Sequence, residues 1–453
     1  MSRISLEQAA QWCGGQIDPK YAQVCFSGAS NDSRNTEPGQ LFVALQGERD
    51  GHAFIPQALA AGASAVLCSQ QDADYPAILV PDTRRALGDI AREARNRLAI
   101  RVVGITGSVG KSTTKEMIAR VLSNRYKTGK TPVNHNNDIG LPMAILAIPE
   151  DTEVAVLEMG MNHFGEMSYL TSIARPDVAV ITNIGTMHIE HLGSREGILH
   201  AKLEILEGLK PGGRVIYNGD EPLLWNLRTS SAVRPQYFGL ENPACEVLGT
   251  ELREEEGRIT FTVTAQGESF PVTLPVEGRH FASDALAAIA VGRLLDVPVE
   301  QIQAGLAGFQ SMEGRQEILE AGGYTIIKDC YNAGPESMAA SLSVLSRRKG
   351  RRIAVLGDML ELGVCSQAEH YRVGRIAAGK CDFLFALGEN AERVVNGAVT
   401  GGMRPERALA CSAMEELVEA LRACAMPGDA LLFKGSRGMK MERALELFLA
   451  GEK

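Results

Sequence analysis

The chain of 453 residues is too long to be one small module, because domains usually contain about 100–200 residues. With 45% hydrophobic residues, 22% charged residues and 47 glycines, its composition is typical of a folded α/β protein and excludes a disordered or fibrous chain. The 46 Lys and Arg residues against 55 Asp and Glu residues give a net charge of -9, so no global positive field is available to bind nucleic acid.

The cysteines and the apolar runs indicate the cellular compartment of the protein. Nine cysteines are dispersed from Cys13 to Cys424, without a CxxC pair or a His/Cys cluster at zinc spacing, so we expect reduced thiols. The first residues, MSRISLEQAAQWCGG, lack the apolar core of a signal peptide. No apolar run approaches the ~20 residues of a membrane helix. We therefore expect a cytoplasmic protein with no membrane span.

In chain order, the hydrophobic pattern predicts three domains. Residues 1–98 mix short apolar runs with turn-rich stretches, which predicts a small N-terminal α/β domain. Residues 99–312 alternate apolar runs such as RVVGIT and VAVLEMG with helical stretches, which predicts a mostly parallel sheet, and the runs ITFTVTA and FPVTLPV predict an antiparallel flank. Residues 313–453 contain YTIIKD, RIAVLGDM, FLFALG and ALLFKGSR, which predict a second, Rossmann-like doubly wound sheet. The predicted fold class is therefore α/β with three domains.

The strongest chemical signal is GITGSVGKSTT at residues 104–114, where a predicted strand gives way to a helix. Glycines let backbone N–H groups close around phosphate oxygens, and the helix N-terminus adds a positive dipole. Lys111 would reach the β- and γ-phosphates, and Ser112 could bind Mg²⁺. The strict Gly-x4-Gly-Lys-Ser/Thr pattern fails, because Ile105 occupies the first glycine position and the extra glycine is Gly107. Strand, loop and helix nevertheless agree, which favours a nucleotide site over a Gly-rich turn with a surface lysine.

Potential metal ligands follow two further strands of the central region. Glu158 follows VAVL, and His188 comes a few residues after VAVITN. In open α/β sheets ligands bind beyond the carboxyl ends of the strands, so both side chains could face the nucleotide. Mg²⁺ prefers carboxylate and phosphate oxygens, and histidine is a less usual ligand. Taken alone, His188 is more often a hydrogen-bonded structural histidine, Glu158 is equally a strand-end surface acid, and Lys202 is a solvated helix lysine.

The same strand-end pattern recurs in residues 313–453. Asp329 follows TIIK, Asp358 follows VLG, and Lys434, Ser436 and Arg437 follow ALLF. Several such residues at one edge indicate a second ligand-lining face across from the first. The residues alone therefore predict an ATPase whose nucleotide and co-substrate lie between domains.

Over essentially its whole length the sequence resembles the Mur ligases of peptidoglycan synthesis. The resemblance is carried by DSRNTEPGQLFVALQGERDGHAFI, GITGSVGKSTT, NHNNDIGLP, LEMGMNHFGEM, TNIGTMHIEHLGSREGILHAKLEI, GDMLELG and FKGSRGMKME. Within the family, the segments GDMLELG and KGSRGMKME resemble those of the branch that adds D-alanyl-D-alanine to UDP-N-acetylmuramoyl-tripeptide. This resemblance implies transfer of the ATP γ-phosphate to the tripeptide carboxylate, which gives an acyl phosphate that the dipeptide amine attacks.

The resemblance also implies roles for individual residues. One Mg²⁺ is implied at Ser112 and Glu158, a second Mg²⁺ at His188, and a carbamylated Lys202 near the second metal. The implied catalytic side chains are Lys111, Glu158, His188 and Lys202. The implied nucleotide contacts are Gly107, Ser108, Gly110, Lys111, Ser112, Thr113, Arg315 at the phosphates and Asp329 at the ribose. The implied contacts of the UDP end are Ser30, Asp32, Ser33, Arg34, Gly47, Arg49 and His52. The expected dipeptide contacts are Asp358, Lys434, Ser436 and Arg437, although Arg437 could instead pair with Glu442.

The sequence departs from the family pattern in two places. Where Mur ligases commonly have His-Asn-x-x-Asn on the adenine-side helix, this chain has His280, Phe281 and Asp284, and Gly334 stands where an Asn is common. Phe281 could stack on the base or could fill the helix–sheet core.

Three other interpretations are disfavoured by particular residues. A folylpolyglutamate synthetase-like ligase would not need the UDP-type N-terminal domain or KGSRGMKME. A GTPase would need a guanine-reading Asn-Lys-x-Asp, and the chain contains no Asn-Lys pair. A non-catalytic protein on this fold would be expected to have lost Lys111 or Glu158. We therefore predict an ATP-dependent amide ligase that acts as a monomer.

Overall fold

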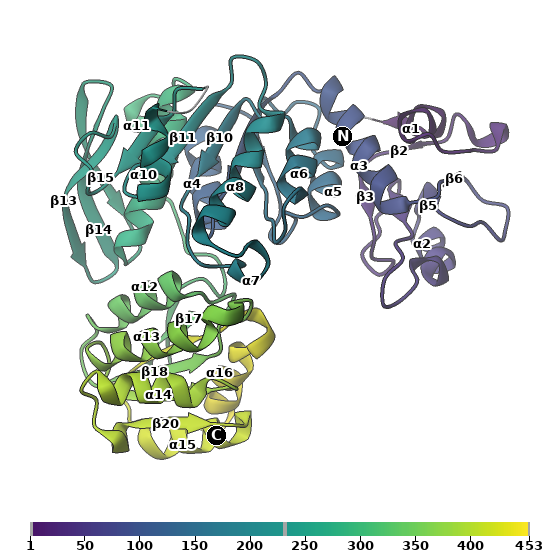
Figure 1. Cartoon of the computed structure of the whole chain (residues 1–453). Helices are drawn as coiled ribbons and strands as arrows, with labels where there is room; N and C mark the ends of the chain where they lie inside the picture. The colour runs from purple at the N-terminus through teal and green to yellow at the C-terminus, as the bar shows by residue number, and fades with distance from the viewer. Residues whose placement is uncertain (1–2, 230–232, 452–453) are drawn as a thin grey trace.

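The computed structural model describes residues 3–229 and 233–451, and it confirms the predicted α/β fold with three domains (Figure 1). The N-terminal domain (purple to dark blue), the central domain (blue to teal) and the C-terminal domain (green to yellow) follow one another along the chain. Each of the three larger sheets belongs to one of these domains.

The N-terminal domain contains a parallel sheet of four short strands in the order β3 (Ala29–Ser30), β4 (Leu41–Val43), β5 (Ala65–Cys68) and β6 (Ala77–Leu79). A small antiparallel ladder pairs β1 (Ile4–Ser5) with β2 (Cys25–Phe26). The helices are α1 (Leu6–Cys13), α2 (Ile55–Ala60) and α3 (Thr83–Arg97). Ser5 caps helix α1, because the Ser5 and Gln8 side chains each accept the other's backbone N–H, which satisfies two donors at the start of the helix.

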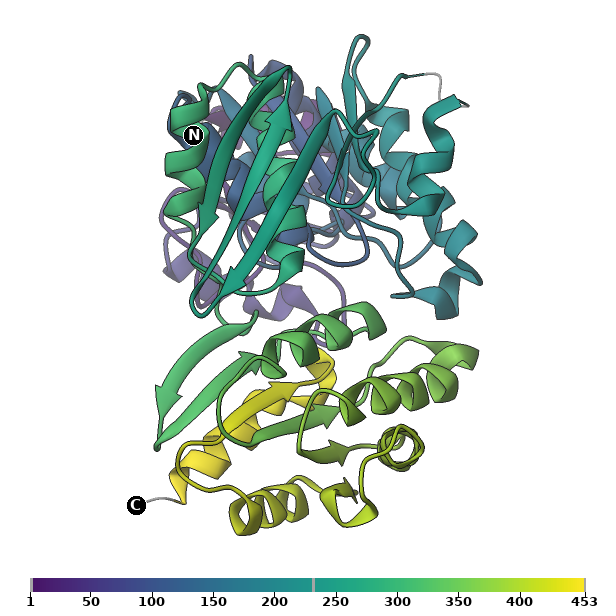
Figure 2. The ribbon, with the colours of Figure 1, turned by 90° about the vertical axis from the view of Figure 1, so that its left-hand side faces the viewer.

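The central domain is built on a nine-stranded sheet. Its order is β15 (Glu268–Leu274), β14 (Arg258–Ala265), β13 (Val247–Glu255), β12 (Gln236–Gly239), β11 (Arg214–Asn218), β10 (Val178–Ile181), β7 (Arg101–Thr106), β9 (Val154–Glu158) and β8 (Thr128–Lys130). The strands from β13 to β8 are parallel, whereas β13, β14 and β15 pair antiparallel, so the predicted flank is confirmed. Figure 2 shows this flank standing directly above the C-terminal domain.

Helices cover both faces of the central sheet, because its parallel strands are apolar on both sides. One face is covered by α4 (Lys111–Ser123), α10 (Arg279–Leu294) and α11 (Val299–Ala307), which form one core with alternate residues of the strands. The opposite face is covered by α5 (Gly140–Leu146), α6 (Glu166–Ala174) and α8 (Arg195–Leu203). Two short helices, α7 (Ile189–Leu192) and α9 (Pro222–Trp225), follow β10 and β11.

The C-terminal domain contains a six-stranded sheet in the order β16 (Glu317–Ala321), β17 (Tyr324–Asp329), β21 (Ala430–Lys434), β18 (Arg352–Gly357), β19 (Phe383–Leu387) and β20 (Ala408–Cys411). Only the edge strand β16 is antiparallel among the strands described here. One face packs on α12 (Pro335–Leu345), α13 (Ser366–Ala378) and α14 (Ala391–Thr400), and the other on α15 (Met414–Cys424) and α16 (Met441–Ala450).

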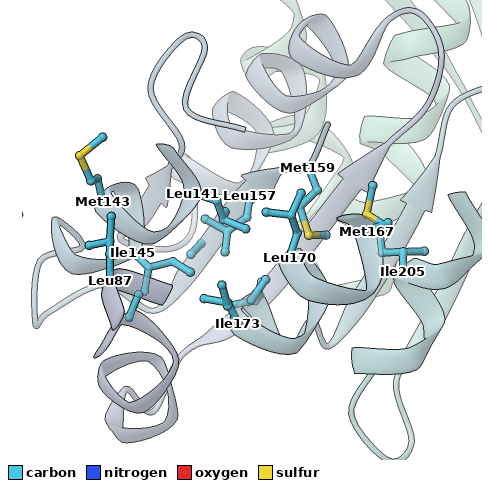
Figure 3. Close-up of a cluster of buried hydrophobic side chains, with 14 of the residues drawn as sticks. Leu87, Leu141, Met143, Ile145, Leu157, Met159, Met167, Leu170, Ile173 and Ile205 are labelled. Carbon is cyan, nitrogen blue, oxygen red and sulfur yellow. The ribbon is translucent and has the colours of Figure 1, made fainter. Parts of the chain in front are cut away.

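The N-terminal and central domains share one hydrophobic core. In Figure 3, Leu87 of α3 lies beside Ile145 of α5 and Ile173 of α6, and all three side chains are fully or almost fully buried. The cores of the C-terminal domain are separate, and Ile189 of α7 is a central-domain side chain that packs against one of them.

Candidate active site

All three domains line one cavity of about 950 Å³. Arg84 comes from the N-terminal domain, the phosphate-loop residues 108–113 and Glu158 come from the central domain, and Arg315 and Lys434 come from the C-terminal domain. The carboxyl ends of β7, β9 and β10 face this cavity, as is usual for ligand sites in parallel α/β sheets.

The loop after β7 has the geometry of a phosphate-binding loop. Gly110 has φ +81, and a Cβ there would lie 2.5 Å from Asp284 Oδ1, so both conformation and space require glycine. Helix α4 begins at Lys111, whose Nζ donates to Gly107 O at 2.7 Å and to Ser108 O at 3.1 Å. Ser112 and Thr113 occupy the first turn of α4 and line the cavity. The predicted loop residues therefore surround one helix N-terminus.

Residues after β10 hold the phosphate loop in place. Asn183 Oδ1 accepts the backbone N–H groups of Ser108 at 3.1 Å and Val109 at 3.0 Å, and Thr182 Oγ1 donates to Val109 O at 2.7 Å. Gly185 N donates to Ser108 Oγ at 2.9 Å. Sequence analysis did not assign this role to Asn183. The sequence shows that Asn183 follows a strand. It does not show that this strand, β10, pairs with β7, and that pairing brings Asn183 to the phosphate loop.

Glu158 is the last residue of β9, and it is only 3% exposed. Asn136 Nδ2 donates to Glu158 Oε1 at 2.9 Å, while Lys115 Nζ lies 3.8 Å from Oε2. Lys115 is fully buried and also donates to Thr131 O at 2.9 Å. The Glu158 carboxylate is thus oriented from two sides. Sequence analysis missed both Lys115 and Asn136, since nothing local distinguishes them from surface residues.

Lys111, on the cavity wall, and the buried Lys202 influence each other's charge. Burial lowers the pKa of Lys111, and the nearby Arg315 lowers it further while Glu158 opposes the shift. Burial, followed by repulsion from Lys111, lowers the pKa of Lys202 well below its ordinary value. No hydrogen bond or ion pair links the Lys202 side chain to any residue in the described part of the chain. Burial and the nearby Lys111 charge therefore both favour the neutral form of this amine.

His188 and Glu361 connect the central domain to the C-terminal domain. His188 has φ +65, lines the cavity and places its Nδ1 2.5 Å from Glu361 Oε2. The hydrogen bond from His188 lowers the pKa of the Glu361 carboxyl. This pairing explains the orientation of the His188 ring, and it leaves the opposite ring nitrogen for another partner.

Arg315 and Asp329 reach the cavity from the C-terminal domain. The Arg315 guanidinium carbon lies 3.8 Å from the centroid of the Tyr331 ring, so the ring supports the cation. Asp329 Oδ2 accepts from Ser341 Oγ and Lys434 Nζ, each at 2.6 Å. The Asp329 carboxylate therefore has internal partners, which fix its position at the cavity edge.

The remaining expected dipeptide residues lie beside the cavity rather than on its wall. Asp358 is buried and accepts from the backbone N–H of Glu389 at 2.8 Å, ahead of α14. Ser436 Oγ accepts from Leu360 N at 2.9 Å. Arg437 begins a short 3-10 helix and donates to Glu442 Oε1 at 3.1 Å with its side chain 69% exposed. Ser436 thus holds the loop that carries Glu361, and Asp358 holds the backbone ahead of α14.

The residues expected at the UDP end group together in the N-terminal domain. Arg34 donates through Nε and Nη2 to both carboxylate oxygens of Asp32, at 2.9 and 2.8 Å. These bonds lower the pKa of Asp32 to about 2. Ser30 Oγ caps the same turn, and Ser33 Oγ donates to Gln57. His52 bonds Asp50 and Ser69 in the segment that also contains Gly47 and Arg49.

The helix that carries the family departures also faces the cavity. Phe281 is 3% exposed and packs 6.0 Å from the Phe309 ring, so it fills the core while its edge reaches the cavity wall. Burial lowers the pKa of His280 to about 4. Asp284 Oδ1 accepts from Thr114 Oγ1 at 2.9 Å, and burial raises the Asp284 pKa to about 7.

Comparison with known proteins decides the family. Three family models match in chain order: "Mur ligase family, catalytic domain" over residues 26–95, "Mur ligase middle domain" over 105–292 and "Mur ligase, glutamate ligase domain" over 314–437. The UDP-N-acetylmuramoyl-tripeptide–D-alanyl-D-alanine ligase of Bacillus subtilis is 40% identical over 98% of this chain and 98% of its own length. The chain belongs to the Mur ligase family. It is therefore a ligase, as predicted.

Other relatives agree with this assignment. The Escherichia coli ligase of the same name is 34% identical, with 98% of both chains covered. A crystal structure of MurF from Acinetobacter baumannii superposes with a TM-score of 0.91 at 32% identity, covering 99% of both chains. MurF ligase from Thermotoga maritima in complex with ADP gives a TM-score of 0.82 at 31% identity, covering 94% of this chain and 98% of its own. The folylpolyglutamate synthase of Mycobacterium tuberculosis, at 16% identity, shares only the fold.

The described residues contain neither a membrane-spanning helix nor a cluster of metal-binding side chains. No helix in residues 3–229 and 233–451 is long and apolar enough to cross a membrane. Within the same ranges, no three His, Cys, Asp or Glu side chains gather in a way that could hold a metal ion.

Proposed function

We propose that this Mur ligase joins D-alanyl-D-alanine to UDP-N-acetylmuramoyl-tripeptide, using ATP. The single observation that carries the proposal is the cavity lined by all three domains, with the phosphate loop and Glu158 on one side and Arg315 and Lys434 on the other. A substrate that binds by its UDP end in the N-terminal domain could extend past Arg84 into this cavity. The relatives named for this reaction match the whole length of the chain.

The first chemical step transfers the ATP γ-phosphoryl group to the tripeptide carboxylate. An oxygen of the carboxylate bonds to the γ-phosphorus while the bond to the β-phosphate oxygen breaks, which releases ADP and leaves an acyl phosphate. Donor and acceptor are both anionic, so cationic groups must offset their repulsion. Lys111, at the start of α4, and Arg315, stacked on Tyr331, are two of the cations that line the cavity, and they come from different domains. The second step is attack of the dipeptide amine on the acyl carbon, with loss of phosphate and a proton.

The residues present fit a Mg²⁺ ion of the kind that phosphate-loop enzymes use. Ser112 and Glu158 offer a hydroxyl and a carboxylate on the same wall of the cavity, and Mg²⁺ prefers such oxygen ligands together with phosphate and water. Lys115 and Asn136 orient the Glu158 carboxylate. Bound there, Mg²⁺ would neutralise phosphate charge. His188 and Lys202 would hold the second ion.

We propose that Lys202 is carbamylated. A neutral amine nitrogen can attack the carbon of CO₂ and lose a proton, which gives a carbamate anion. Burial and the charge of Lys111 both favour the neutral amine at Lys202. The carbamate would supply the anionic oxygens that a second cation beside His188 requires, because the described residues near His188 offer no cluster of three metal ligands.

For the dipeptide we propose that Lys434 and Arg437 provide the cations that meet its carboxylate. Lys434 lines the cavity and already pairs with Asp329. Arg437 would have to leave Glu442 to take part. Ser436 acts by holding the loop at Leu360, and Asp358 acts by holding the backbone ahead of α14. We also propose that the enzyme works as a monomer in the cytoplasm.

Release of phosphate is the direct test of this function. We expect turnover only when ATP, UDP-N-acetylmuramoyl-tripeptide and D-alanyl-D-alanine are all present. Lys111→Ala should reduce kcat by about 10²-fold or more, because Lys111 acts on charge that develops during transfer. Lys127→Ala is the matched control, since Lys127 is exposed and pairs with Asp151 on the surface of the same domain. Near-normal turnover of a folded Lys111→Ala protein would contradict the assignment.

A separate test concerns the carbamate. Lys202→Ala should lose most activity, and a short-chain carboxylic acid should restore part of it by supplying an anion in the space of the side chain. The mass of the intact wild-type protein, measured after trapping with CO₂ present, should include an added CO₂. An alanine variant with full activity, together with no added mass, would refute the carbamate while leaving the ligase function in place.

A further inference from the structure

Asp284 is an acidic residue placed against a phosphate-binding loop, where an anion would be expected to weaken binding. It lies on α10, is 8% exposed, and lines the same cavity as Lys111 and Ser112. Its Oδ1 accepts from Thr114 Oγ1 at 2.9 Å and lies 2.5 Å from the position that a Cβ on Gly110 would occupy. The carboxyl group is thus in direct contact with the loop that would hold the phosphates.

Its second oxygen, Oδ2, makes no hydrogen bond in the described part of the chain and is not sealed from the cavity. The groups that face Asp284 are few. Thr114 supplies a neutral hydroxyl from α4, Arg315 supplies a more distant positive charge from the C-terminal domain, and His280 lies one turn earlier on α10. His280 carries no charge near neutral pH, because burial lowers its pKa to about 4. Among these residues only Arg315 therefore offsets a charge on Asp284.

A bound nucleotide adds several negative charges a short distance from this carboxyl. Two anions within about 6 Å raise each other's pKa, and they do so more strongly where water is excluded. A protonated carboxyl avoids this repulsion, and its O–H can donate a hydrogen bond. Retaining an ionised Asp284 would instead require burying like charges together.

We propose that Asp284 takes up a proton when a nucleotide binds to the phosphate loop, so that the bound state contains a neutral Asp284 whose free oxygen faces the nucleotide. This role rests on the proposed nucleotide site, but it does not follow from it, because an asparagine at this position would bind nucleotide without a proton. Asp284 is then a residue that couples nucleotide affinity to pH.

The direction of the coupling follows from the charge balance. Burial already raises the pKa of Asp284 to about 7 in the free protein, and the phosphates raise it further. Below pH 6 the carboxyl is protonated in both states, so no proton is taken up. Between the two pKa values the free protein is ionised and the complex is not, so affinity falls as pH rises, by up to about tenfold per pH unit. Above both values the affinity becomes constant again.

Calorimetric titration with ADP and Mg²⁺ at pH 8, in two buffers of different ionisation enthalpy, counts the protons taken up. The wild-type chain should take up a large fraction of one proton per ADP bound. The proton uptake of Asp284→Asn should be smaller by that same fraction. Ionisation of ADP itself contributes equally to both proteins. The dissociation constant of the wild-type chain should rise several-fold from pH 7 to pH 8, whereas that of Asp284→Asn should stay flat.

Thr114→Val is the second variant, and it changes the pKa of the Asp284 carboxyl without replacing Asp284 itself. The Thr114 hydrogen bond lowers the Asp284 pKa, so its loss should shift the uptake curve to higher pH. Thr114→Ser retains the hydroxyl and should behave as wild type. ADP binding by the wild-type chain without proton uptake would overturn the proposal while leaving the nucleotide site intact. Equal uptake by the wild-type and Asp284→Asn proteins would also overturn it, and absence of ADP binding would instead refute the proposed function.

Discussion

The central domain meets its two neighbours through interfaces of opposite chemistry. On the N-terminal side, α3 packs into the core of the central domain, where Leu87 and Ile173 are fully buried. The close approach is visible at Gly88, where a Cβ would lie 1.9 Å from the Tyr169 hydroxyl. The buried Arg95 side chain adds a hydrogen bond from Nε to Ala174 O at 2.9 Å.

On the C-terminal side the contacts are mainly charged or polar. Arg348 Nη2 lies 2.8 Å from Glu277 Oε2, with both side chains 7% exposed. Beside them Arg347 pairs with Glu254, and Lys349 lies 3.9 Å from Glu256, so three cations after α12 face the acidic turn between β13 and β14. The pair His188–Glu361 closes the other side of the cavity.

The difference indicates which domain is able to move. Apolar burial is lost whenever an interface opens, and water offers no replacement. Charged pairs exchange with water at little net cost, so a charged interface can open and close. We therefore expect the N-terminal and central domains to behave as one body, and the C-terminal domain to move during turnover, which carries Arg315 and Lys434 to and from the phosphate loop.

The largest expected effect is on the apolar interface. Ile173→Ala should lower the free energy of unfolding by about 2–5 kcal/mol, because it leaves a cavity in the shared core. Chemical denaturation monitored by circular dichroism measures this loss. Ile318→Ala is the matched control, since Ile318 is 37% exposed on the edge strand of the C-terminal domain. If Ile173→Ala caused the N-terminal domain to unfold in a separate transition, the two domains would not form one body.

Arg348→Met should produce the next largest effect, on closure rather than on folding. It leaves the Glu277 carboxylate unpaired when the C-terminal domain is closed. This raises the free energy of the closed state by on the order of 1–3 kcal/mol and therefore favours the open state. We expect a larger radius of gyration by X-ray scattering and a KM for ATP raised about tenfold. Lys349→Met, with the Lys349 side chain 94% exposed, should change both by less than twofold. An unchanged KM in Arg348→Met would show that this pair does not control closure.

A smaller effect, on the pH dependence of stability, is expected at Asp284 in the cavity between the central and C-terminal domains. The Asp284 pKa is raised from 3.8 to about 7 in the folded chain, so its stabilising contribution is complete below pH 4 and is lost as pH rises to 7. Asp284→Asn avoids this loss and should be more stable by on the order of 2 kcal/mol above pH 7. Thermal unfolding without nucleotide should show a Tm advantage that grows from pH 4.5 to pH 7 and then levels off. A constant advantage would mean that Asp284 does not titrate in this range.

The smallest effect is expected at the exposed pair Arg437–Glu442. Such a pair contributes about 0–1 kcal/mol, so Arg437→Ala should leave Tm almost unchanged. If Arg437 meets the dipeptide carboxylate, the KM for D-alanyl-D-alanine should rise while the KM for UDP-tripeptide does not. Glu442→Gln is the control, because it frees Arg437 without removing it. An unchanged dipeptide KM in Arg437→Ala would leave the pair with Glu442 as its role.

Much of the fold could be predicted from hydrophobic periodicity, because the spacing of apolar residues along a strand or helix shows which of its faces is buried. The runs RVVGIT and ITFTVTA predict a parallel strand and an antiparallel strand, and β7 and β14 are these strands. The phosphate loop could be predicted for the same reason, since strand, glycines and helix start are consecutive in the chain. The family resemblance supplied the reaction and most of the site residues beyond that loop.

What the sequence could not determine depends on neighbours that are distant in the chain. Asn183 supports the phosphate loop only because β10 pairs with β7, and Lys115 supports Glu158 only because α4 packs beside β9. The tertiary structure alone decided that Asp358 holds a loop and that Arg437 pairs with Glu442 outside the cavity. Burial sets the protonation of Asp284 and Lys202 in the same way, since an ionisable side chain acquires its pKa from the atoms that surround it, and these atoms come from other elements of the fold.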